Sequence, residues 1–111
     1  MDAQLGDTLT ARAIFDALPL TTSFSTWGDE IYFSIPVEAE LDATAAEIVE
    51  VGDLGYWPTG CAFCIFFGPT PMSTSGKIVP ASAVNVVGKV VGDARLFKGV
   101  MGEREVTLEK A

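Results

Sequence analysis

The sequence predicts a single, mainly β domain: a closed or nearly closed β-barrel capped by one or two helices. Three observations support this prediction. The 111 residues are enough for one domain and leave no room for a second core. One amphipathic helix can be identified near the N-terminus, and after it short apolar segments alternate with turn-forming residues. Short strands in close succession are typical of barrels, in which closure removes exposed strand edges.

The helix is expected from about Thr8 to Leu18. Asp7 or Thr8 can cap its start, and Pro19 ends it because proline disfavours a helical conformation in the residue before it. Four apolar residues at helical spacing form the stripe that is expected to be buried: Ala11, Ile14, Phe15 and Leu18.

The rest of the chain is predicted to form strands. Thr21–Trp27 and Glu30–Ile35 flank the turn residues Gly28-Asp29 and are expected to form a hairpin. Cys61–Phe67 is apolar on both faces, which indicates a core on one side and a covering element on the other. The other expected strands are Ile48–Val51, Leu54–Trp57, Val84–Val91 and Glu105–Glu109, the last with Val106 and Leu108 facing inward.

Composition excludes several classes of partner. Seven Lys plus Arg against fifteen Asp plus Glu give a formal charge of -8, which repels nucleic-acid phosphates and anionic lipid surfaces. The longest unbroken apolar piece, Cys61–Phe67, is far shorter than the ~20 residues of a membrane-spanning helix. Met1–Gln4 has no basic or apolar signal character, so a cytoplasmic location is expected. No nucleic acid and no membrane is predicted as a partner.

The chain contains no histidine, which excludes Ser-His-Asp and Cys-His catalysis and histidine-ligated metal sites. Cys61 and Cys64 have C-x-x-C spacing, but two cysteines cannot complete four zinc ligands. In a strand, positions i and i+3 also point to opposite faces. The two thiols are therefore predicted to be buried and reduced, with no metal and no cofactor.

Aromatic residues suggest a candidate binding site. Tyrosine and tryptophan carry a polar atom that needs a partner when buried, and Glu30 is the nearest charged residue to them along the hairpin. Two interpretations remain open: the aromatic side chains plug the ends of the barrel, or some of them line a ligand pocket. The aromatic residues concerned are Trp27, Tyr32, Phe33, Tyr56 and Trp57.

Several stretches of the chain resemble the small prokaryotic cyclophilin-like proteins of unassigned function. The stretches that carry the resemblance are Thr26–Val37, Gly52–Pro58, Phe66–Ser73 and Pro80–Gly88. Together with the helix they span nearly the whole chain, residues 1–111. The resemblance implies one cyclophilin-type closed barrel capped by helices.

The chain also resembles true cyclophilins more weakly, and its departures from their active site imply that prolyl isomerase activity is absent. It aligns Ile31–Pro36 with the strand that carries the catalytic arginine, and Cys61–Phe66 with the strand that carries a glutamine and a phenylalanine. Loss of the arginine removes the main electrostatic contribution to the reaction. The residues at the aligned positions here are Phe33 or Ser34 on the first strand, and Ala62 and Cys64 on the second.

The resemblance also implies a β-hairpin before the helix, whereas only Met1–Gly6 precedes Asp7. Either the barrel lacks its first strand or the sequence begins late. An unpaired edge exposes backbone hydrogen-bonding groups, so a homodimer is expected, formed beside Met1–Gly6 or beside the strand that carries Val106 and Leu108.

Three hypotheses of function follow. The first is a module without isomerase activity that binds an unknown small molecule or peptide. The second is an enzyme, either a residual prolyl isomerase or a carboxylate-based catalyst that uses Glu30 with Tyr32 or Tyr56. The third is an interaction subunit without a pocket. The residues predicted to bind the ligand in the first hypothesis are Glu30, Tyr32, Phe33, Tyr56, Trp57 and Cys64.

Overall fold

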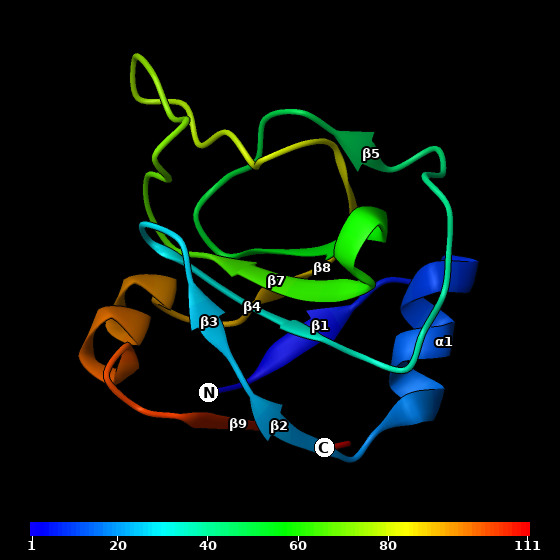
Figure 1. The fold of residues 1–111 in the computed structure, drawn as a ribbon. Coiled ribbons are helices and arrows are strands. Elements are labelled where there is room, and N and C mark those ends of the chain that lie inside the picture. The colour runs from blue at the N-terminus through cyan, green and yellow to red at the C-terminus, as the bar shows by residue number, and fades with distance from the viewer.

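A computed structural model describes all residues, 1–111, as a mainly β protein with one α-helix and two short 3-10 helices (Figure 1). The helix α1 spans Leu9–Ala17, and the 3-10 helices η1 and η2 span Pro58–Gly60 and Ala94–Val100. The strands are β1 (Ala3–Leu5), β2 (Leu20–Ser23), β3 (Ser25–Thr26), β4 (Glu30–Ser34), β5 (Ala45–Ala46), β6 (Asp53–Trp57), β7 (Ala62–Phe66), β8 (Val84–Val90) and β9 (Glu105–Leu108).

The predicted helix is confirmed, but only part of its apolar stripe is buried. Thr8 is the N-cap, and its hydroxyl accepts a hydrogen bond of 3.1 Å from the backbone N–H of Ala11. Ala11 and Ile14 are buried, whereas 45% of Phe15 is exposed. The side of α1 that carries Phe15 is therefore not covered by the sheet.

Most strands form a sheet in the order β1-β8-β6-β7-β4-β3, and β2 and β9 form a separate pair. These two sheets share one nearly continuous strand, because β2 and β3 are separated only by Phe24. The backbone N–H of Phe24 donates to the carbonyl of Arg104, just before β9, and the N–H of Trp27 donates to Glu30 at the start of β4. Alternate residues of this strand thus bond to β9 on one side and to β4 on the other.

The strands do not form a closed ring. When β2 and β3 are counted as one strand, the path β1-β8-β6-β7-β4-β3/β2-β9 ends at β1 and β9, each of which has one pairing partner. The fold is therefore mainly β, as predicted, while the expected barrel is not confirmed. We call the interval between β1 and β9 the edge gap.

Side chains pack on both faces of β7, as predicted from its continuous apolar sequence. The inner core includes Phe63 and Ile65. The opposite face carries a smaller group, here called the outer cluster, which is covered by two loop segments. The backbone N–H of Val49 donates to the carbonyl of Ile78 at 2.9 Å and holds these two segments together. The outer cluster consists of Val49, Cys64, Phe66, Ile78 and Val84.

The expected strand at Ile48–Val51 is wrong. Val49 makes only an isolated bridge with Ile78, and the nearby strand is β5. Ile48 and Val51 are exposed while Val49 is buried in the outer cluster. The segment therefore covers the outer face of the sheet and does not join it.

The two cysteines are free, as expected, but only Cys64 is buried. Cys61 is half-buried and lies before β7 with a left-handed φ of 47°, so it is not part of the strand. The alternation of strand faces therefore does not govern where its thiol points. The predicted hairpin is confirmed only in part, because Thr21–Trp27 is divided into β2 and β3 and only β3 pairs with β4. The remaining predicted strands are confirmed with small shifts of their ends, and Val106 and Leu108 do pack against the inner core.

One buried amide ties the helix, the sheet and a connecting segment together. Asn85 of β8 is 0% exposed. Its Oδ1 accepts from the backbone N–H of Asp42 at 2.8 Å, and its Nδ2 donates to the carbonyl of Glu40 at 2.9 Å and to the hydroxyl of Thr10 at 3.4 Å. A buried polar group with all these partners fixes their relative positions.

We expect Gly55→Ala to destabilise the protein by about 1–3 kcal/mol, because the added methyl group overpacks the outer cluster. A Cβ at Gly55 would lie 3.0 Å from Cγ2 of Val84 and 3.1 Å from Cε2 of Phe66. Urea unfolding measures the change in free energy. Gly99→Ala is the matched control, since a Cβ there meets nothing within 4 Å. Equal stability of the two variants would show that the outer cluster is loosely packed.

Candidate functional site

The six residues predicted to bind a ligand are divided between the two faces of the sheet. Register pairs Glu30 with Phe66 and Tyr32 with Cys64, which places these four residues on the outer face. Trp57 also packs against the outer cluster, and its indole N–H donates to the hydroxyl of Ser82 at 2.6 Å. The outer face therefore holds four of the six: Glu30, Tyr32, Trp57 and Cys64.

Phe33 and Tyr56 belong to the inner core instead. The Phe33 and Phe63 ring centroids are 5.4 Å apart. The hydroxyl of Tyr56 donates to the carbonyl of Val37 at 2.6 Å and accepts from the backbone N–H of Ala39 at 3.2 Å. The Tyr56 hydroxyl thus holds the backbone at Val37 and Ala39 in place. Neighbours in a strand point to opposite faces, so Tyr32 and Phe33 cannot line one pocket together.

Glu30 is a buried carboxyl group on this outer face. Only 6% of the residue is exposed, and it forms no salt bridge. Burial raises the pKa of Glu30 from 4.5 to about 7, and a hydrogen bond from the Cys64 thiol partly opposes that rise. Burial, followed by the nearby Glu30 charge, raises the pKa of Cys64 well above its usual value. At neutral pH Cys64 is therefore a thiol, and Glu30 is a mixture of acid and carboxylate.

The positions aligned with the isomerase residues carry no cation. Neither β4 nor β7 contains lysine or arginine. Ser34 uses its hydroxyl to donate to the carbonyl of Gly60 at 3.2 Å, while Ala62 and Cys64 are buried. The outer face of these two strands has no placed donor comparable to a guanidinium group.

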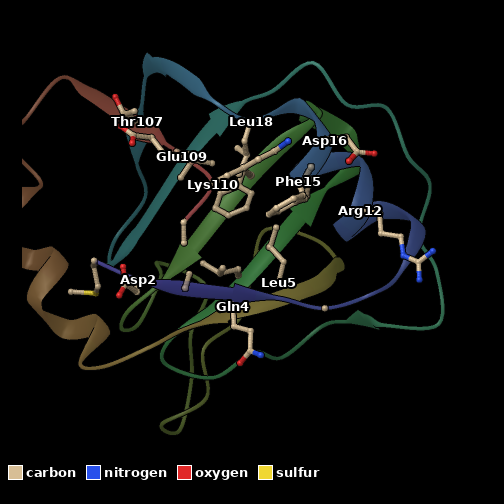
Figure 2. Close-up of a pocket in the computed structure, with 18 of the residues that line it drawn as sticks. Asp2, Gln4, Leu5, Arg12, Phe15, Asp16, Leu18, Thr107, Glu109 and Lys110 are labelled. Carbon is tan, nitrogen blue, oxygen red and sulfur yellow. The ribbon is translucent and has the colours of Figure 1, made fainter.

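A cavity of about 820 Å³ lies at the edge gap, between β1, α1 and the C-terminal residues. Leu54, Phe63 and Ile14, all members of the inner core, contribute to its lining. Figure 2 shows Leu5, Phe15 and Leu18 at this space. The cavity therefore reaches from the surface to the interior of the sheet.

Charged groups surround this apolar lining. The Lys110 ammonium lies 4.9 Å from the centroid of the Phe15 ring, at cation-π distance. The charged side chains that line the cavity are Asp2, Asp7, Arg12, Asp16, Glu109 and Lys110. Carboxylates outnumber cations among them.

This cavity was not predicted from the sequence, and none of the six predicted residues lines it. One signal was present: the apolar stripe of the helix includes Phe15 and Leu18, and both line the cavity. The aromatic residues on which the prediction relied lie elsewhere because aromatic side chains also fill cores.

No helix of the structure has the length and apolar character needed to span a membrane.

We expect the stability of the protein to fall as pH rises from about 4.5 through 7, with Glu30 as one cause. Its pKa is higher in the folded state, so the folded protein binds more protons than the unfolded chain in that range. One pKa unit corresponds to about 1.4 kcal/mol, so a rise from 4.5 to about 7 corresponds to about 3.5 kcal/mol, which screening by solvent reduces to about 2 to 3 kcal/mol.

Glu30→Gln should remove this loss and be more stable than the natural protein at pH 8, but not at pH 4.5. Urea unfolding across pH measures the effect. Glu47→Gln removes the same charge from an exposed position and serves as the control. Parallel pH profiles for the natural protein and the Glu30 variant would contradict the assignment.

Comparison with known proteins agrees with this geometry. A family model described as cyclophilin-like matches residues 1–109. The chain is also similar to the solution structure of a hypothetical protein from Archaeoglobus fulgidus, with 41% sequence identity and a TM-score of 0.77. That similarity covers 98% of this chain and 85% of the archaeal one. No significant match was found among curated proteins. The chain belongs to the cyclophilin-like family.

Proposed function

We propose that the protein is a binding module without prolyl isomerase activity, and that its ligand occupies the cavity at the edge gap. The observation that carries the proposal is the cavity of about 820 Å³, whose lining includes inner-core residues. Ligand pockets in proteins have volumes of about 300–1,000 Å³, an apolar lining and a few polar groups that orient the ligand. This cavity has those properties.

The lining restricts the chemistry of the ligand. Leu54 and Phe63 suit an apolar body that enters the interior of the sheet. Lys110 and Glu109 suit a polar or charged end that stays near solvent. Phe15 lies between these regions and provides an aromatic face.

The outer face supports a ligand site less well. Cys64 and Phe66 are 1% and 0% exposed, since Val49, Ile78 and Val84 pack against them. A ligand there would have to displace packed side chains of the protein itself.

A second candidate function is acid-base catalysis by Glu30, which its pKa near 7 favours. Tyr32, which is half-buried on the same face, could assist it. Tyr56 is not suited to that role because it lies on the inner face and its hydroxyl is already bonded.

A metabolite and fragment screen read by NMR should identify ligands that shift resonances of Leu5, Phe15 and Leu54. We expect Phe15→Ala to weaken their binding at least tenfold, because the ring forms part of the lining. Leu9→Ala is the matched control, as Leu9 is an 85% exposed apolar residue of the same helix outside the cavity. Shifts confined to Tyr32 and Cys64 would favour the outer face, and equal effects of both substitutions would count against the proposal.

A protease-coupled assay on a proline peptide should show no acceleration of cis-trans isomerisation above the uncatalysed rate. The reason is that β4 and β7 provide no cationic donor for the twisted peptide bond. An active cyclophilin serves as the positive control. Turnover within tenfold of that control would overturn this part of the proposal.

A further inference from the structure

Two loop segments, residues 47–50 and 77–79, lie over the outer cluster and are here called the cover. Each segment contributes one buried side chain to the cluster, Val49 from the first and Ile78 from the second. The other residues of the cover are exposed or half-buried. The cover is therefore attached to the outer face of the sheet mainly through these two side chains.

Backbone hydrogen bonds fix the ends of the first segment more firmly than its middle. Before it, Ala45–Ala46 (β5) pairs with β8, and after it the N–H of Gly52 donates to the carbonyl of Phe66 at 2.7 Å. Between these anchors, Val49 donates to Ile78 of the other cover segment and not to a strand. In contrast, β7 beneath the cover is paired on both sides. Segments with few bonds to the rest of a protein open at lower cost than central strands.

Glu30 adjoins the cluster that the cover protects. It pairs with Phe66 in the register of β4 and β7, and it accepts a hydrogen bond from the Cys64 thiol. Phe66 and Cys64 belong to the same cluster as Val49 and Ile78. A negative charge on this carboxyl group is therefore surrounded by apolar side chains, which is unfavourable unless water or a cation reaches it.

The charged groups around Glu30 have partners of their own or face solvent. Asp29, which precedes it, lies 3.4 Å from Nζ of Lys98. Lys89 of β8 lies 3.5 Å from Asp53 of β6 and 3.8 Å from Glu50 of the cover. Neither β3 nor residues 68–71 carry a titratable side chain. The other titratable groups on β4, on β7 and on the cover are Tyr32, Cys64, Glu47 and Lys77, of which the last two are exposed.

We propose that the cover is a proton-controlled gate, which lies closed over the outer face while Glu30 is protonated and moves away when Glu30 releases its proton to solvent. Movement of the cover admits water to the carboxylate and leaves the pairing of β7 intact. Because burial raises the pKa of Glu30 to about 7, the change occurs near neutral pH. The gate acts on the outer face and does not depend on a ligand at the edge gap.

Hydrogen exchange between pH 5.5 and 8.5, corrected for the intrinsic effect of pH on exchange, tests the gate. We expect the protection of the Val49 amide to fall about tenfold across this range, because ionised Glu30 favours the open cover. The Ile65 amide, in the central strand β7, should be better protected than Val49 at every pH. Equal protection of the two amides at every pH would mean that the cover opens only with the whole protein, and would overturn the inference.

A pair of variants assigns the effect to Glu30. Glu30→Gln keeps the size of the side chain but cannot ionise, so the protection of Val49 should become independent of pH. Glu47→Gln is the matched control, since it removes the same charge from an exposed position on the cover itself. It should behave as the natural protein does. A pH dependence that persists in the Glu30 variant, or disappears in the Glu47 variant, would contradict the proposed role of Glu30.

The Cys64 thiol provides a second readout, because Cys64 is only 1% exposed when the cover is closed. Cys61→Ser leaves Cys64 as the only thiol. At pH 8.5 we expect a disulfide reagent to modify Cys64 at least tenfold faster in this variant than in the variant that also carries Glu30→Gln.

This comparison reports access and not thiol acidity. The nearby Glu30 charge raises the pKa of Cys64, which by itself slows the reaction in the protein that keeps Glu30. Faster modification in that protein therefore requires an open cover. Equal rates, or slower modification when Glu30 is present, would show that the cover stays closed above pH 7 and would overturn the gate. This readout does not use the Val49 amide, so the two measurements test the inference independently.

Discussion

Antiparallel pairing between neighbouring strands constrains the topology of this molecule more than any single contact does. Neighbouring strands alternate in direction, so a path of seven strands ends with two strands that run the same way. β1 and β9 therefore cannot complete an antiparallel ring by themselves. The open interval leaves Phe15 of α1 uncovered and gives the interior of the sheet access to solvent.

Sequence pattern predicted the elements well where local chemistry decides them. Thr8 and Pro19 mark the ends of α1, and the apolar run in Cys61–Phe67 indicates a strand buried on both faces. Ile48–Val51 was predicted incorrectly because an apolar run does not distinguish a strand from a loop that covers one. β7 needs such a cover, and Val49 provides part of it.

The candidate site was harder to predict, since a cavity depends on which strands are adjacent and not on any motif. Alternation along a strand is enough to separate Tyr32 from Phe33, and Tyr56 from Trp57, on the basis of sequence position alone. It does not show that Leu5 and Thr107, at opposite ends of the chain, border the same space. That information lies in long-range register, which a single sequence does not contain.

Different kinds of contact hold the two walls of the cavity. On one side, the first turn of α1 is fastened to β8 through Thr10, and the connecting segment is fastened through Glu40 and Asp42. On the other side, Lys110 of the C-terminal tail contacts the helix through a cation-π interaction with Phe15. A ligand in the proposed site would therefore lie between a helix tied to the sheet by buried hydrogen bonds and a C-terminal tail held to that helix by the attraction of an ammonium group to an aromatic ring.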